Sequence, residues 1–63
     1  MSFQTNLLGA RVKIGESTPW VKANERGTIR AICHDSDGIW CVVQLDFDQR
    51  FWNFDLCNLI AIR

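Results

Sequence analysis

The chain is poor in the residues from which small proteins build covalent or catalytic sites: it has three cysteines and one histidine in 63 residues. An odd number of cysteines cannot form a closed set of disulfides. We therefore interpret Cys33, Cys41 and Cys57 as small core residues of a reduced protein. His34 follows Cys33, but neighbouring residues of a strand face opposite ways, so the two do not make a nucleophile and its base. The cysteines and His34 also lack the close pairing of zinc ligands, and no metal or cofactor is predicted.

Long apolar runs and an excess of one charge are missing as well. No stretch approaches the roughly 20 apolar residues of a membrane span. The first residues show no basic region before an apolar run, so neither membrane binding nor a signal peptide is predicted, and we expect a cytoplasmic protein. Seven Lys and Arg residues balance seven Asp and Glu residues. That balance counts against a protein that binds its ligand mainly through contacts to phosphate groups, and it favours self-association.

What the chain does have is alternation of apolar and polar residues. It occurs in three runs, each directly after a glycine, at 10–14, 28–32 and 39–45. Successive side chains of a strand point to opposite sides of a sheet, so a strand with one buried face needs this period of two. The three runs predict an all-β fold, and the length predicts a single domain over residues 1–63.

Five strands are expected, at 10–14, 28–33, 39–46, 51–54 and 60–62. A long polar connection, 15–25, separates the first two, and Gly27 is expected to supply turn angles at its end. A five-residue polar loop, 34–38, follows, and a tighter turn occupies 46–50. Residues 55–59 lack alternation and suit one 3-10 turn with Asp55 as its N-cap. In the second strand Ile29, Ala31 and Cys33 are expected on one face, although apolar residues on both faces near its end indicate a bulge.

This order of elements resembles the SH3-like barrel superfamily over nearly the whole chain. The segments that carry the resemblance are Gly9-Ala-Arg-Val-Lys-Ile, Arg26-Gly-Thr-Ile, Val43-Gln-Leu-Asp and Leu59. Similar spacing occurs in Tudor-like and KOW-like modules, a small-barrel component of photosystem I, the variable chain of ferredoxin–thioredoxin reductase and the type II dihydrofolate reductases, so no single family is identified. The resemblance implies a small five-stranded SH3-like barrel with one short 3-10 turn before the last strand. The type II dihydrofolate reductases have an active-site strand with the sequence Val-Gln-Ile-Tyr. This chain has Arg50-Phe51-Trp52-Asn53 in its place, so the dihydrofolate reductase reaction is not implied.

The aromatic residues give the strongest functional signal. Phe51 and Trp52 are adjacent on one strand, so one of them must face outward, and Trp40 is also expected to face outward. Because aromatic side chains dominate binding hot spots, we predict a non-catalytic interaction module, not an enzyme, that binds a protein partner or a second copy of itself. The predicted binding residues are Trp20, Trp40, Phe47, Trp52, Asp46, Asp48 and Arg50. A cage for a methylated cation is a sharper form of this hypothesis. The competing interpretation is structural: the aromatics cap the barrel, and Trp40 pairs with Trp52 across strands.

Two further functions stay open. Arg11, Lys13 and Arg30 are expected to lie outward on neighbouring strands, where Trp40 could stack a base, and this arrangement would suit single-stranded nucleic acid. The neutral net charge disfavours that alternative. The other alternative is a subunit of a small oligomeric enzyme with its site at a symmetric pore, because the chain alone does not combine an acid, a base and a pocket.

Overall fold

Five antiparallel strands and one 3-10 turn make up the fold. The structure, a computed structural model, describes residues 7–62; residues 1–6 and 63 of the predicted domain lie outside the described part. The elements are β1 (Arg11–Ile14), β2 (Arg26–Asp35), β3 (Gly38–Leu45), β4 (Phe51–Asp55), η1 (Leu56–Asn58) and β5 (Leu59–Ala61). The predicted all-β class and the 3-10 turn before the last strand are confirmed. Asp55 is the N-cap residue of η1, but its carboxylate makes no cap hydrogen bond.

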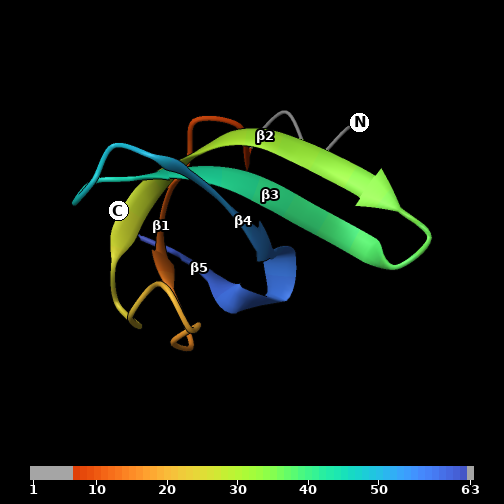
Figure 1. Cartoon of the computed structure of the whole chain (residues 1–63). Coiled ribbons are helices and arrows are strands. Elements are labelled where there is room, and N and C mark those ends of the chain that lie inside the picture. The colour runs from red at the N-terminus through yellow and green to blue at the C-terminus, as the bar shows by residue number, and fades with distance from the viewer. Residues whose placement is uncertain (1–6, 63) are drawn as a thin grey trace.

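The strands form one sheet in the order β4-β3-β2-β1-β5. The sheet is strongly bent, and the long β2–β3 hairpin projects to one side while β1 and β5 cross at the other (Figure 1). Within residues 7–62 no pairing joins β4 to β5, so these two strands are the edges of an open sheet. Closure into an SH3-like barrel therefore stays a prediction. None of the helical segments in the described part has the length and apolar character needed to cross a bilayer.

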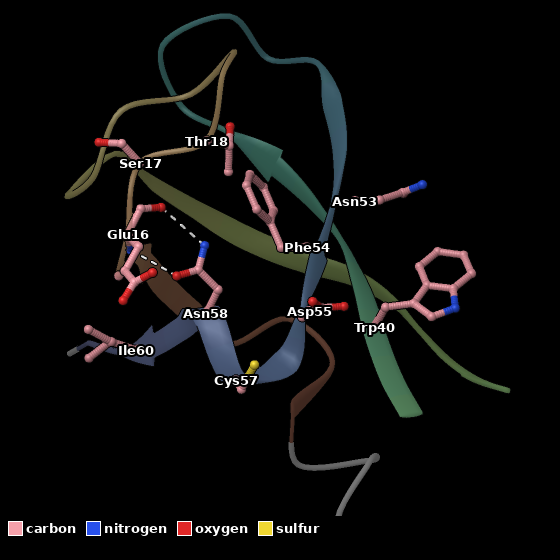
Figure 2. Close-up of a pocket in the computed structure, with 11 residues that line it drawn as sticks. Glu16, Ser17, Thr18, Trp40, Asn53, Phe54, Asp55, Cys57, Asn58 and Ile60 are labelled. Carbon is pink, nitrogen blue, oxygen red and sulfur yellow. Dashed lines mark hydrogen bonds between the residues drawn. The ribbon is translucent and has the colours of Figure 1, made fainter. Parts of the chain in front are cut away.

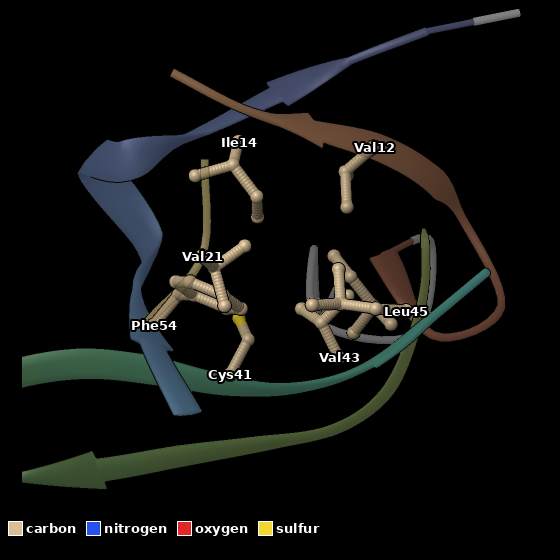
Figure 3. Packing of buried hydrophobic residues seen from close by; sticks show 8 residues of the cluster. Val12, Ile14, Val21, Cys41, Val43, Leu45 and Phe54 are labelled. Atoms are coloured by element: carbon tan, nitrogen blue, oxygen red, sulfur yellow. The ribbon is translucent and has the colours of Figure 1, made fainter. Parts of the chain in front are cut away.

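The core lies between two parts of the bent sheet. Figure 3 shows Val12 and Ile14 pointing inward from β1 and Val43 and Leu45 pointing toward them from β3. These inward positions agree with the predicted alternation. The remaining core residues are Val21, Ile29, Cys41 and Phe54. Val21 comes from the long β1–β2 connection, so this loop closes the core instead of standing free.

A bulge in β2 changes which side chains face the core. Ile29 pairs with Val43 and Ala31 pairs with Val42, so one extra residue, Arg30, is accommodated between them. Beyond the bulge the alternation reverses: Ile32 pairs with the buried Cys41 and packs on the core. The prediction of Ile29, Ala31 and Cys33 on one face is therefore wrong beyond Ile29, for the reason that a bulge shifts side-chain direction by one residue.

The two turns around β2 also differ from expectation. The predicted five-residue loop at 34–38 is wrong, because β2 continues to Asp35 and β3 begins at Gly38. The Asp35 Oδ1 atom accepts a hydrogen bond of 2.8 Å from the Asp37 N–H, and this Asx turn, with a positive φ of 133° at Gly38, lets two residues reverse the chain. In the turn before β2, the residue with the positive φ is Asn24 and not Gly27, which was expected to supply the turn angles. Gly27 lies within β2, where a Cβ atom would stand 2.6 Å from the Gln44 carbonyl oxygen.

Candidate functional site

The aromatic residues of the predicted site do not share one surface. Trp40 pairs with Asp55, whereas Trp52 pairs with the buried Val43, so the two indoles lie on opposite faces of the sheet. Trp20, in the β1–β2 loop, and Phe47, in the β3–β4 turn, are 75% and 57% exposed. The cross-strand pair of Trp40 with Trp52 does not form either. The structure thus separates Trp40 from Trp52.

The β4 register decides between Phe51 and Trp52. Phe51 is 60% exposed on the outer face, and Trp52 is half-buried against the core. The Trp52 Nε1–H donates to the Asp48 Oδ2 atom at 2.9 Å, and the Asp48 Oδ1 atom accepts the Arg50 N–H at 2.9 Å. These bonds hold the β3–β4 turn together, so Asp48, Arg50 and Trp52 have a structural explanation there.

Asp46 is held by an ion pair across the sheet. The Arg11 Nη1–H donates to its Oδ1 atom at 2.8 Å, and Nη2 bonds the second oxygen. Arg11 thereby lowers the pKa of Asp46, mainly through the hydrogen bond, and Asp46 raises the pKa of Arg11 in the same way. The Asp46 carboxylate of the predicted site is therefore already bonded to a residue of the same chain, as the Asp48 carboxylate is.

The three basic residues of the nucleic-acid alternative lie outward, but they are not a free cationic surface. Arg11 is bound to Asp46, and the Arg30 Nε–H donates to the Gln44 Oε1 atom at 3.1 Å. Lys13 lies directly opposite Arg26 across the β1–β2 pair. The net effect is a mixed-charge face, in keeping with the neutral charge of the chain.

A groove with a volume of about 860 Å³ lies between the β1–β2 loop, β4 and η1. In Figure 2 Ile60, Glu16 and Asn58 gather on one side of it, Trp40 and Asn53 lie on the other, and Asp55 and Cys57 lie between them. Gly15, Ser17, Thr18 and Phe54 complete the lining. Of the predicted binding residues only Trp40 lines this groove.

One wall of the groove is fixed by Asn58 in η1. Its Oδ1 atom accepts the Glu16 N–H at 2.8 Å, and its Nδ2–H donates to the Glu16 carbonyl at 3.2 Å (dashed in Figure 2). The Gly15 N–H also donates to the Asn58 carbonyl at 2.8 Å. The loop is shaped further by Thr18, whose hydroxyl accepts the Val21 N–H at 2.9 Å. These contacts hold the loop beside η1, so the groove is built into the fold.

Carboxylates mark the Trp40 end of the groove. A smaller adjoining hollow of about 220 Å³ shares Trp40 and Asp55 with it and adds Asp35 and Asp37. The Trp40 Nε1–H donates to the Asp35 Oδ2 atom at 3.2 Å, which orients the half-buried indole at this end. Among residues 7–62, Trp40 is the aromatic residue that lines the smaller hollow, and Phe54 joins it in the lining of the larger groove.

The chemistry available in and near the groove is limited. Within residues 7–62 no three His, Cys, Asp or Glu side chains are arranged to hold a metal ion. The three cysteines are free thiols, and burial raises the pKa of the innermost, Cys41. Cys57 is exposed in the groove, but His34 is on the β2–β3 hairpin and does not line it.

Sequence reasoning missed most of the groove residues, above all Asn53, Asp55 and Asn58. Both the long loop and the 3-10 turn were expected, but only the β1–β5 pairing brings them together. The available signal was an asparagine directly before the last strand, since its amide can satisfy backbone groups of a neighbouring loop.

A scan against protein-family models gives no match for this chain, and neither do searches of curated proteins and of solved structures.

Proposed function

We propose that the protein is a non-catalytic interaction module, with the architecture of an SH3-like barrel, that binds an extended segment of a partner protein. The observation that carries the proposal is the groove between β4 and the wall formed by the β1–β2 loop and η1, with half-buried Trp40 at one end. Its volume is in the range of binding clefts, roughly 300–1,000 Å³. A long open groove accommodates an extended chain, and an indole fixed at one end supplies the kind of anchor that dominates binding energies.

Trp20 is a second contact in this proposal. It lies two residues beyond Thr18, which lines the groove, and it is the most exposed of the large apolar residues in the described part. Tryptophan is enriched among binding hot-spot residues, which supports a contact role for Trp20. Phe47 and Trp52, at the β3–β4 turn, are not needed for this binding mode.

The proposal of a binding role over an enzyme rests on the residues of the groove. Among residues 7–62 its lining contains no histidine, lysine or tyrosine that could act as a base toward the Cys57 thiol, and neither of its carboxylates, Glu16 and Asp55, is hydrogen-bonded to that thiol. A nucleophilic site requires such a base within hydrogen-bond reach. We propose the cytoplasm as the place of action, since three unpaired thiols suit a reducing compartment. The nucleic-acid alternative gains no support from the groove, because Arg11, Lys13 and Arg30 lie outside it.

Selection from a random 12-residue peptide display library tests the proposal. Peptides selected on the wild-type protein are expected to bind the Trp40→Ala variant about tenfold more weakly, since Trp is the commonest hot-spot residue. The matched control is Phe47→Ala, which removes an exposed aromatic outside the groove and is expected to leave affinity unchanged. Amide shifts of a ¹⁵N-labelled protein would locate each peptide. A selection that yields no peptide, or peptides that bind Trp40→Ala as tightly as wild type, would contradict the proposal.

A further inference from the structure

β4 offers unpaired backbone groups. The Leu45 N–H donates to the Arg50 carbonyl at 3.0 Å, so Leu45 and Arg50 are a hydrogen-bonded pair of the β3–β4 ladder. In an antiparallel ladder such pairs alternate with pairs whose backbone groups point away. The N–H groups of Phe51, Asn53 and Asp55 therefore point away from β3. β4 is an edge strand, and within residues 7–62 no hydrogen bond uses these three N–H groups.

The groove runs along this free edge. Asn53, Phe54 and Asp55 all line it, although their side chains alternate between the outer and the inner face. A hollow that touches three consecutive residues of a strand must border the edge of the strand, since no single face presents all three side chains. The unpaired Asn53 and Asp55 N–H groups therefore open toward the groove.

This edge is unprotected compared with the opposite one. β5 has only three residues, and short edge strands resist further pairing. β4 has five residues, Phe-Trp-Asn-Phe-Asp, with no lysine, no proline and no bulge in its register with β3. Lysine, proline and bulges in an edge strand are features that natural sheets use to block the addition of another strand.

The charge of the groove defines the chemistry of its ligand. Among residues 7–62, the groove and the adjoining hollow are lined by four carboxylates and by no Lys, Arg or His residue, although the whole chain has equal numbers of acidic and basic residues. The four carboxylates belong to Glu16, Asp35, Asp37 and Asp55. Those of Glu16, Asp37 and Asp55 form no ion pair within residues 7–62. A ligand with positive charge would complement them.

We propose that a basic, extended segment of the partner protein pairs with β4 as an additional antiparallel strand. This inference rests on the proposed function and specifies its ligand. A residue opposite Asp55 would share the outer face with Asp55 and Trp40, so a basic side chain there meets a carboxylate directly and an indole beyond it. A residue opposite Phe54 would face inward toward Thr18 and would be apolar. The ligand therefore alternates basic and apolar residues.

The test uses the peptide acetyl-Val-Arg-Val-Arg-Val-Arg-Val-amide and the ¹⁵N-labelled protein. In the proposed pairing the Arg N–H groups face β4 and the Val N–H groups face away. N-methylation of the three Arg residues is expected to weaken binding about tenfold, since it removes the strand hydrogen bonds. N-methylation of three Val residues is the matched control and is expected to have little effect. In the parent complex the amide protons of Asn53 and Asp55 are expected to exchange more slowly with solvent.

Protein variants provide a second measurement. Asn53→Pro removes an N–H that points away from β3, whereas Asn53→Ala changes the side chain and keeps this N–H. The Pro variant, checked for folding by its spectrum, is expected to bind the Arg/Val peptide about fivefold to tenfold more weakly than the Ala variant. A Glu/Val peptide of the same length is expected not to bind.

The outcomes separate the two proposals. Equal binding of the two N-methylated peptides, or unchanged exchange at Asn53 and Asp55, overturns strand addition. If the protein binds library peptides in the groove but does not bind the Arg/Val peptide, the proposal of a basic added strand is overturned and the proposed function is retained. A groove that binds neither overturns both proposals.

Discussion

Asn58 and Glu16, 42 positions apart in the chain, exchange two hydrogen bonds between the Asn58 amide and the Glu16 backbone. The amide presents a donor and an acceptor side by side, as a peptide group does, so it extends the pairing of β1 and β5 by one step into the loop. This single side chain thereby holds the β1–β2 loop against η1, and the two together form one wall of the groove.

Asn58→Ala is expected to lower the free energy of unfolding by about 1–2 kcal/mol, because two hydrogen bonds are lost and the Glu16 backbone groups must find water. Urea denaturation measures the change. The control is Asn53→Ala: this asparagine is exposed, and its side chain forms no hydrogen bond within residues 7–62, so its loss should change stability by less than about 0.5 kcal/mol. Equal effects of the two substitutions would show that the Asn58 bonds do not hold the loop.

Gly27→Ala is expected to destabilise the protein by about 3 kcal/mol, because the added methyl group meets backbone and overpacking of this kind strains the fold. The Cβ atom would lie 2.6 Å from the Gln44 carbonyl oxygen and 2.7 Å from the Val43 Cγ1 atom. Thermal and urea unfolding measure the loss. Gly9→Asn is the control: Gly9 has φ of 81°, a Cβ atom there would meet no atom of residues 7–62 within 4 Å, and asparagine tolerates that conformation. A small effect at Gly27 would mean that β2 and β3 separate more readily than this close approach suggests.

The inward residues of β1 and β3 could be predicted from the sequence because the apolar residues of β1 alternate with Arg11 and Lys13, and Gln44 marks the outer face of β3. Val12, Ile14, Cys41, Val43 and Leu45 are all buried. In β4 the adjacent Phe51 and Trp52 left the choice open when taken as a pair, although Asn53 and Asp55 share the face of Phe51 and mark it as the outer one. The register settles the choice, because Trp52 lies opposite the buried Val43.

Two features depend on information that local pattern does not contain. Ile32 reaches the core only because Arg30 is accommodated in a bulge, and the position of a bulge depends on how β2 pairs with β3. The groove forms where Asn58 meets Glu16, a contact between distant parts of the chain. Its residues are polar and scattered, so no spacing identifies them as a group. The aromatic pattern pointed correctly to the outer face of Trp40 but not to the groove beside it.

The Asp46–Arg11 pair is expected to make stability depend on acid pH. Arg11 lowers the pKa of Asp46 in the folded protein, so the pair contributes stability above the unfolded carboxyl pKa of about 3.9. That contribution is lost as the pH falls through the lower folded value. Asp46→Asn should therefore be less stable than wild type at pH 6, and the difference should shrink toward pH 2 and in high salt. Denaturation midpoints from pH 2 to 6 check this. Asp37→Asn, which removes a carboxylate with no ion pair in the described part, should not reproduce the effect.

Lys13 and Arg26 place two positive charges directly opposite each other across β1 and β2. Like charges in such a pair are destabilising, although Arg26 is also near the carboxylate of Asp46. Lys13→Glu is expected to raise the free energy of unfolding by about 0.5 kcal/mol, since it turns repulsion into a cross-strand ion pair. The gain should fall as salt is added, because both side chains reach solvent. Lys22→Glu makes the same charge change in the β1–β2 loop and controls for net charge. If both variants shift the urea midpoint equally, the effect belongs to the charge of the whole molecule and not to the pair.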